Sequence, residues 1–314
     1  MTVSFGLYGT MPPARLLGDD TLLPAGLRPV QFSPLLPPQA QSLEAMPTAT
    51  FESIVIHAPP ATLERGFVLA HAIRCTRPGG TIAVWAANDR GGQRLQKEMT
   101  AFGLTAIGAV ARDHARLVRG QRPDIVPAAC DTAITAGALR LDPALNCWTQ
   151  PGVFSWDRID TGTALLLRHL PVLAGKGADF GCGIGLLSRQ VLASADVTQF
   201  TLIDIDGRAI AAARRNVIDP RAQIIWGDMC APETPIPQQL DFCVMNPPFH
   251  DTGRADIGLG QAFIIRARAS LKPGGVCWLV ANRHLPYEDH LTALFRTVTC
   301  HAQDQGFKII RAMT

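Results

Sequence analysis

The sequence lacks the patterns that mark disulfide-stapled, metal-binding, exported or membrane-spanning chains. Its eight cysteines stand singly, without a Cys-x-x-Cys pair, and the histidines show no paired spacing. Isolated cysteines in apolar runs behave as small hydrophobes, so reduced thiols are expected rather than a disulfide framework or a metal site. The start has no basic stretch followed by an apolar run, and no segment approaches eighteen apolar residues. We therefore expect a cytoplasmic protein that makes no membrane contact.

Lysine is scarce, because only 4 of the 29 basic residues are lysine and 25 are arginine. The net charge of +3 does not by itself indicate a nucleic-acid-binding protein. Arginine, however, makes bidentate and stacking contacts to phosphates and bases that lysine does not. Arg90, Arg94 and Lys97 fall on one face of a helix expected over 91–102. A second basic cluster consists of Arg112, Arg116, Arg119 and Arg122. Each cluster fits either a solvated surface or an RNA contact.

The densest chemical signal is a glycine-rich turn that follows an apolar strand. Its residues are Asp179, Gly181, Cys182, Gly183 and Gly185. Alternate glycines let the backbone turn tightly and approach a ligand, because no Cβ obstructs either move. A dinucleotide-binding fingerprint would separate its last two glycines by three positions. The spacing therefore favours S-adenosylmethionine over NAD or FAD, with Asp179 orienting the loop or reaching the methionine amine.

Two further strands are expected to end in acids beside this turn. One ends at Asp204, whose carboxylate oxygens match a ribose diol, and Ile205 follows it. The other leads to Asp228 and Met229, where the carboxylate either bonds the adenine amino group or is a solvated turn acid. Ligands of an open parallel sheet bind beyond the carboxyl ends of its strands. These residues are therefore predicted to share one cofactor site.

A fourth strand, expected over 241–245, leads into Asn246, Pro247, Pro248 and Phe249. Exocyclic amines are poor nucleophiles because their lone pair is delocalised into the ring. The Asn246 side-chain oxygen and the Pro247 carbonyl can each accept one amine N–H and so aim the lone pair at a methyl group. Phe249 offers a face on which a base can stack. We predict these four residues as catalytic, with Asn246 also in the cofactor site, and alignment as the main source of acceleration.

The two halves of the chain carry similar motifs in the same order. Glu52–Pro60 parallels Asp241–Pro248 with one residue inserted, and Arg77–Gly80 parallels Lys272–Gly275. Three or more matches in one order indicate an internal duplication. The first half lacks Gly-x-Gly-x-Gly and has Ala58 before its double proline, where a methyl group cannot accept a hydrogen bond. We interpret 1–120 as a degenerate, non-catalytic domain, 121–150 as a proline-rich linker and 151–314 as the catalytic domain.

The residues around the tetrad carry a family resemblance. With Asn246–His250, Gly152–Ser155 upstream and Val280–Tyr287 downstream, the sequence resembles the ribosomal RNA guanine-N2 methyltransferases of the RsmC/RlmG type. The resemblance implies an α/β fold of two tandem Rossmann-like methyltransferase domains, the second with a seven-stranded class I sheet. It also implies S-adenosylmethionine as donor and a guanine N2 of small-subunit ribosomal RNA as acceptor. By the same resemblance, the cofactor residues are Asp179, Gly181, Gly183, Asp204 and Asp228, and Asn246 to Phe249 hold the target base.

The sequence is also compatible with other functions. The tetrad also suits an adenine N6 or a protein glutamine, and the stretch after Val280 is similar to the large-subunit branch of the family. A ribosome-assembly or RNA-binding factor is the non-enzymatic alternative. Because one chain already holds two related halves, we expect a monomer.

Overall fold

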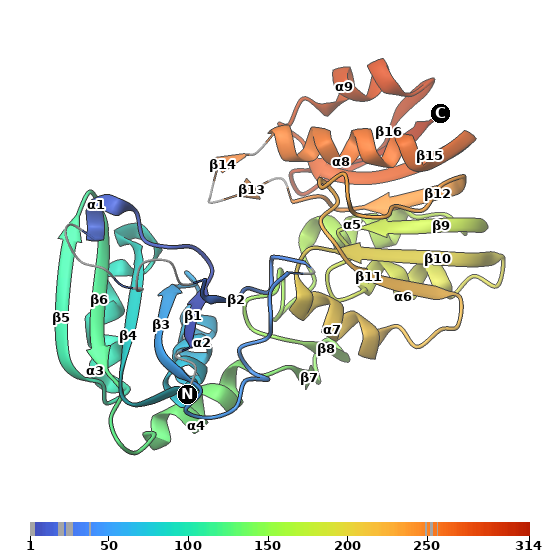
Figure 1. Cartoon of the computed structure of the whole chain (residues 1–314). Helices are drawn as coiled ribbons and strands as arrows, with labels where there is room; N and C mark the ends of the chain where they lie inside the picture. The colour runs from blue at the N-terminus through green and yellow to red at the C-terminus, as the bar shows by residue number, and fades with distance from the viewer. Residues whose placement is uncertain are drawn as a thin grey trace. The chain divides into compact units, whose positions relative to one another are not determined.

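The protein, seen in a computed structural model, consists of two compact α/β units (Figure 1). The structure describes residues 4–17, 22, 28–37, 39–248, 250–251, 254–255 and 257–314, with the backbone alone at 250, 251, 254, 255 and 257. The units span Met1–Ala138 and Leu139–Thr314. Each has its own sheet and its own hydrophobic core.

The first unit is built on a six-stranded sheet with the order β2-β1-β3-β4-β6-β5. Its elements are β1 (Phe5–Tyr8), α1 (Ala14–Leu17), β2 (Val30–Phe32), β3 (Phe51–His57), α2 (Thr62–Cys75), β4 (Thr76–Ala87), the 3₁₀ turns η1 (Asn88–Arg90) and η2 (Gly92–Arg94), α3 (Leu95–Ala101), β5 (Thr105–Arg112), β6 (Ala115–Gln121) and α4 (Ala128–Gly137). Strands β2, β1, β3 and β4 pair in parallel, and β6 and β5 close the edge antiparallel.

The second unit is built on a seven-stranded sheet with the order β11-β10-β9-β12-β15-β17-β16. Its elements are β7 (Arg140–Asp142), β8 (Cys147–Thr149), α5 (Thr161–His169), β9 (Gly175–Phe180), α6 (Leu186–Leu192), β10 (Val197–Asp204), α7 (Gly207–Asn216), β11 (Ala222–Trp226), β12 (Leu240–Met245), β13 (His250–Asp251), β14 (Arg254–Ala255), α8 (Ile257–Ser270), β15 (Leu271–Asn282), α9 (Tyr287–Leu294), β16 (Thr297–Asp304) and β17 (Phe307–Met313). The first five strands of this order are parallel, and β17 runs antiparallel to both of its neighbours, β15 and β16. The class I methyltransferase sheet expected from the sequence is thus confirmed.

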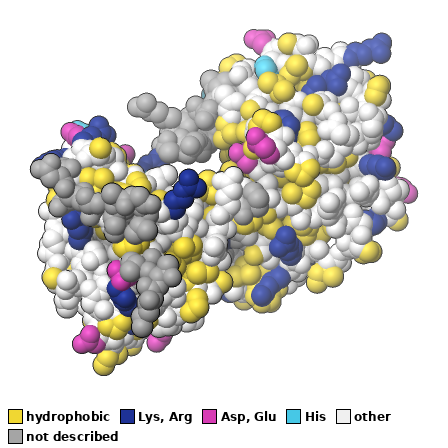
Figure 2. Space-filling model, viewed as in Figure 1, with side chains coloured by type: hydrophobic (Ala, Val, Ile, Leu, Met, Phe, Trp, Pro, Cys, Tyr) yellow, Lys and Arg dark blue, Asp and Glu magenta, His cyan; other side chains and the backbone are white. Residues whose placement is uncertain are grey.

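The face drawn in Figure 2 does not separate sharply by charge. On this face, Lys and Arg side chains lie scattered among hydrophobic and acidic ones. Within the described part of the chain, no helix combines the length and apolar character needed to cross a bilayer.

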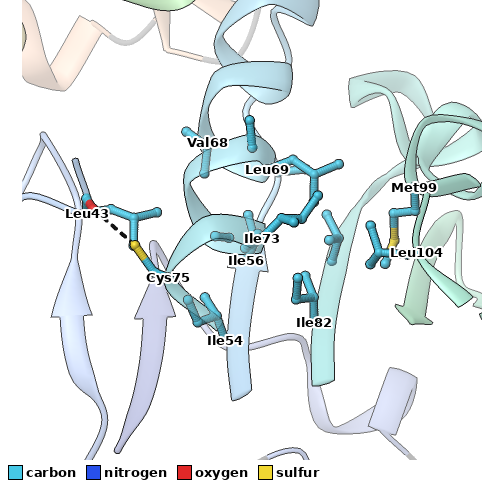
Figure 3. Packing of buried hydrophobic residues seen from close by; sticks show 14 of the residues in the cluster. Leu43, Ile54, Ile56, Val68, Leu69, Ile73, Cys75, Ile82, Met99 and Leu104 are labelled. Carbon is cyan, nitrogen blue, oxygen red and sulfur yellow. Dashed lines mark hydrogen bonds between the residues drawn. The ribbon is translucent and has the colours of Figure 1, made fainter. Parts of the chain in front are cut away.

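Strand residues of the first unit alternate between two sides of its sheet, as the strand period requires. On one side, Ile54, Ile56 and Ile82 are 0–1% exposed and pack under α2. Figure 3 shows Val68, Leu69 and Ile73 of that helix in the same cluster, with Ile73 next to Ile56. Burying such side chains is the main stabilising contribution, at roughly 25 cal/mol per Å² of apolar surface.

The two sheets repeat one another at the level of single contacts. The order β3-β4-β6-β5 of the first unit matches β12-β15-β17-β16 of the second. Arg77 pairs with Glu52 at the start of β3, and Lys272 pairs with Asp241 at the start of β12. Both ion pairs join the first residues of one central strand to the basic residue of the Pro-Gly-Gly turn. The tandem arrangement inferred from the motif order is therefore present in three dimensions.

The segment expected as a linker, 121–150, is folded into both units. Helix α4 packs on α2 in the first unit, whereas the hairpin β7-β8 packs on α7 in the second. The Asn216 amide exchanges hydrogen bonds with the backbone of Trp148 at 2.7 and 2.9 Å, which fixes the hairpin. The units meet between Ala138 and Leu139, so the structured hairpin belongs with the second unit. The prolines therefore bound short elements of this segment rather than forming a linker.

The helix expected over 91–102 is wrong in its first turn. Gly91 has φ +96°, a left-handed conformation that interrupts a helix, and α3 begins only at Leu95. A Cβ on Gly92 would lie 2.6 Å from the Ala86 carbonyl, so the chain needs glycine where it passes close to the end of β4. Arg90 and Arg94 consequently lie in two separate 3₁₀ turns, and Arg90, Arg94 and Lys97 do not share one helix face.

Candidate functional site

A cleft of about 390 Å³ opens at the carboxyl ends of β9, β10, β11 and β12 in the second unit. Its volume falls in the range of small-molecule and cofactor sites. The expected site residues that line it are Gly181, Gly183, Asp204, Ile205, Asp228, Met229, Asn246, Pro247 and Pro248. The sheet therefore brings together the ends of four strands, as the topology of an open parallel sheet requires.

The glycines of the turn share a positive φ but have different surroundings. Gly181, Gly183 and Gly185 all have positive φ, at 76°, 54° and 87°. A Cβ on Gly183 would meet nothing within 4 Å, because this residue borders the open cleft. A Cβ on Gly185 would lie 2.8 Å from Val217, so this glycine permits the start of α6 to pack against the end of α7. Gly185 does not line the cleft.

Asp204 is held rigidly at the end of β10. The backbone N–H of Gly183 donates to its Oδ2 at 2.7 Å, and the N–H of Asp206 donates to its Oδ1 at 2.8 Å. Burial raises the pKa of Asp204 to about 6, although these two N–H groups work in the opposite direction. Each oxygen keeps a further lone pair, which is what binding to a diol requires.

Asp179 lies one layer behind the cleft. It is fully buried, and Ser188 Oγ on α6 donates to its Oδ2 at 2.7 Å. Its Oδ1 has no hydrogen-bond partner among the described residues. Burial raises the pKa of Asp179 to about 7. Cys182 is also buried and outside the cleft lining, and burial raises the pKa of its thiol well above the usual range.

The side chain of Asn246 is fixed by two neighbours from the start of α5. Its Nδ2 donates to Asp160 Oδ2 at 3.0 Å and to Thr163 Oγ1 at 2.9 Å. The same Asp160 oxygen accepts the backbone N–H of Thr163 at 3.0 Å and so caps α5. Since the amide nitrogen is the atom that faces these acceptors, the amide oxygen is the group that Asn246 can offer to an incoming amine.

Other cleft residues were not assigned by the sequence motifs. The acids Asp160 and Asp206 and the side chains of Phe154, Phe263, Asn282 and Phe307 also line it. Phe154 is 68% exposed and presents an aromatic ring at the cleft. The signal available for Asp160 was its place before a helical run, which is typical of an N-cap. Phe249, predicted as the stacking ring, lies outside the described residues.

The equivalent place in the first unit is closed by an arginine. Arg65, 2% exposed, donates from Nη1 to the carbonyl oxygens of Pro59 at 2.9 Å and Pro60 at 2.8 Å. Glu98 accepts from its Nε and Nη2, both at 2.7 Å. The carbonyl that corresponds to that of Pro247 is therefore already engaged within the unit.

The donor set of the cleft fits S-adenosylmethionine. The cofactor carries a ribose diol, an adenine ring and two cationic groups, of which the sulfonium is one. The carboxylates of Asp204 and Asp228 line the cleft beside apolar side chains, whereas those of Asp160 and Asp206 are engaged by Asn246 and Arg208. Among the described residues, no three His, Cys, Asp or Glu side chains are grouped so that they could hold a metal ion.

Comparison with known proteins agrees with this geometry. A family model described as the methyltransferase small domain matches residues 144–311. Ribosomal RNA small subunit methyltransferase C of Shewanella loihica is 29% identical, over 83% of this chain and 77% of that protein. The protein of the same name from Pseudomonas entomophila is 31% identical, over 85% of this chain and 80% of its own length.

A solved structure also matches both units. It is the T. thermophilus 16S rRNA N2 G1207 methyltransferase (RsmC) in complex with AdoMet and guanosine, with a TM-score of 0.74 and 25% identity. The match covers 88% of this chain and 76% of that one. The chain therefore belongs to the methyltransferase small domain family, as an S-adenosylmethionine-dependent methyltransferase of the ribosomal RNA small subunit methyltransferase C type.

Proposed function

We propose that this protein transfers the methyl group of S-adenosylmethionine to the exocyclic N2 amine of a guanine in small-subunit ribosomal RNA. The observation that carries the proposal is the fixed Asn246 amide, which lies in one cleft with Pro247 and Asp204. The relatives named above are small-subunit methyltransferases, and the T. thermophilus protein acts on a guanine N2. The protein works as a monomer in the cytoplasm, where ribosomal subunits are found.

In this proposal the cofactor is held by the glycine turn and two acids. Asp204 accepts the ribose hydroxyls, and Asp228 binds the adenine amino group beside Ile205 and Met229. The open side of Gly183 lets the cofactor approach the backbone. Asp179 acts from behind, by fixing α6 through Ser188 rather than by touching the methionine amine. The cofactor supplies the electrophilic methyl group.

The target base is held by the residues after β12. Asn246 Oδ1 and the Pro247 carbonyl each accept one N–H of the amine, which turns the nitrogen lone pair toward the methyl group. Proline fixes φ and therefore the direction of its neighbours' peptide groups. Pro248 and Phe249 complete the seat for the base, and the exposed ring of Phe154 adds a second stacking face. Fixed dipoles and alignment supply the acceleration, and no strong base is needed.

The first unit contributes RNA contacts through Arg90 and Arg94. Both arginines line a cleft of about 310 Å³ beside Asn88, whereas Lys97 does not. Within the described part of the chain, neither arginine forms an ion pair or a side-chain hydrogen bond, so both can pair with phosphate. The guanidinium fork suits phosphate oxygens.

The test is methyl transfer from labelled S-adenosylmethionine to separated ribosomal subunits from a strain that lacks this gene. We expect labelled N2-methylguanine in small subunits and none in large ones. The Asn246→Ala variant, which leaves the described fold contacts of β12 intact, should bind the cofactor and transfer little label.

Other outcomes identify the rival functions. N2-methylguanine in large subunits alone would assign the protein to the large-subunit branch. Label in N6-methyladenine or in a protein glutamine would replace the acceptor while keeping the donor. If Asn246→Ala restored normal growth and ribosome profiles to a deletion strain, an assembly role independent of catalysis would replace the proposal.

A further inference from the structure

The Asn246 amide has two ends of nearly equal size and opposite chemistry. A 180° rotation about its last torsion exchanges the acceptor Oδ1 with the donor Nδ2 at little steric cost. With the oxygen toward the substrate, Asn246 accepts an amine N–H. With the nitrogen toward the substrate, two N–H donors face each other and the amine is repelled. The protein therefore needs a device that chooses one orientation.

We propose that Asp160 and Thr163 are positioning residues that hold the Asn246 amide with its oxygen toward the target amine; this inference rests on the proposed function of the cleft. A carboxylate has acceptors only, so only Nδ2 can face Asp160 Oδ2 at 3.0 Å. Thr163 Oγ1 provides a second acceptor at 2.9 Å. The flipped amide would place Oδ1 against the carboxylate, which is electrostatically unfavourable.

The Asp160 carboxylate, which selects the orientation of the Asn246 amide, is itself held in place. Asp160 Oδ2 accepts the backbone N–H of Thr163 at 3.0 Å, as the N-cap of α5. Thr163 is 9% exposed, so its hydroxyl is surrounded by protein. A cap oxygen that is hydrogen-bonded to a helix N–H has little freedom to move. The Asn246 amide, which donates to this oxygen, is therefore held in place as well. The capping position and the orientation of the amide are thus served by one oxygen atom.

Two substitutions separate these roles. Asp160→Ser keeps a good N-cap but is too short to reach Asn246. Asp160→Asn keeps the cap and can still present an oxygen to both Thr163 N–H and Asn246 Nδ2. We expect Asp160→Ser to lower kcat for small-subunit methylation about 10- to 100-fold, with KM for S-adenosylmethionine unchanged. The conservative Asp160→Asn should stay within about threefold of the wild-type kcat, because it retains the acceptor.

A readout without catalysis accompanies the kinetics. The side-chain NH₂ signal of Asn246, identified by its loss in Asn246→Ala, is followed by NMR hydrogen exchange. It should be protected in the wild type and in Asp160→Asn, and should exchange rapidly in Asp160→Ser. The neighbouring exposed Thr161 provides the control, since Thr161→Ala should leave exchange and kcat at wild-type values. Thermal unfolding and cofactor binding are measured for every variant.

The outcomes divide cleanly. Equal kcat and equal protection in Asp160→Ser and Asp160→Asn would overturn the inference. A loss of kcat in Asp160→Ser that is explained by a lower melting temperature would overturn it as well. In the double variant Asp160→Ser/Asn246→Ala, we expect no loss beyond that of Asn246→Ala alone, because the two residues act through one group. A wild type that labels no guanine would overturn the proposed function, while the exchange data would still decide the role of Asp160.

Discussion

Ser188 Oγ donates a 2.7 Å hydrogen bond to Asp179 Oδ2, and both side chains are completely buried. Burial raises the pKa of Asp179 to about 7. The folded protein therefore binds a proton that the unfolded chain, with an ordinary aspartate, releases near pH 4. The contribution of this group to stability is full below about pH 4 and declines as the pH rises toward 7.

The substitution Asp179→Asn tests this account of stability. It removes the buried charge and keeps the acceptor for Ser188, so the variant should melt higher than the wild type at pH 7.5. Each unit of pKa shift is worth about 1.4 kcal/mol, and each kcal/mol about 2–4 °C for a unit of this size. Below pH 4 the two melting curves should converge. A constant difference across this range, measured by calorimetry, would contradict the buried ionisation.

Cofactor binding should depend on the ionisation of Asp204. Its pKa is raised to about 6, chiefly by burial, and only the carboxylate form can accept hydroxyl hydrogens with both oxygens. The affinity for S-adenosylmethionine should therefore fall below pH 6. Where binding requires the ionised form, the Kd should rise about tenfold for each unit of pH. Titration calorimetry between pH 5 and 8 measures this slope.

The control for that slope is a pair of amide variants. Asp204→Asn should bind weakly with little pH dependence over the same range. Asp196, exposed at the opposite end of β10 from the cleft, provides the match, and Asp196→Asn should keep the wild-type slope. A slope that survives in Asp204→Asn would assign the titration to another group.

Alanine at two neighbouring glycines should separate folding from binding. Gly185→Ala places a methyl 2.8 Å from Val217 and adds strain at φ 87°, so it should destabilise the second unit by about 2–4 kcal/mol. Gly183→Ala meets open space and should cost about 1 kcal/mol, from its backbone conformation alone. Denaturant unfolding measures both. Gly183→Ala should nonetheless weaken cofactor binding more than its stability loss explains, because its methyl points to the open cleft.

Charge reversal tests the RNA contacts of the first unit. Arg90→Glu and Arg94→Glu should each weaken binding to small-subunit RNA. Each should also reduce the slope of log K against log salt by about one, as expected for the loss of one phosphate contact. Lys97→Glu makes the same change in charge outside the cleft and serves as the control. Filter binding at several salt concentrations gives the slopes. Equal effects from all three variants would indicate a general electrostatic effect and remove the cleft from the interface.

The parts of the site that follow from local sequence patterns could be predicted from the sequence. Gly181, Gly183, Asp204, Asp228 and 246–248 each lie at or just after the end of a strand, and parallel strands bring their carboxyl ends to one edge. Proximity of the cleft residues was therefore predictable from strand order alone. The duplication was predictable for the same reason, since equal motif order produced equal sheet order.

What the sequence could not reveal depends on contacts between distant residues. Asp160 and Asn246 are 86 positions apart, and no local pattern states that a helix cap and a strand end share one hydrogen bond. The same holds for Arg65 and Glu98, which are 33 positions apart. The interrupted helix after Asn88 had a readable signal in Gly91-Gly92, but helical spacing of the basic residues outweighed it.

The guanidinium of Arg65 has the same planar arrangement of nitrogens as the N1–C2–N2 edge of guanine. It donates to the Pro59 and Pro60 carbonyls and pairs with the Glu98 carboxylate. The first unit thus holds one of its own side chains at the position that corresponds to the base site proposed for the second unit. A base site at this position would require Arg65 to move and would also need the Gly-x-Gly-x-Gly turn that this half lacks, so a single substitution would not create one.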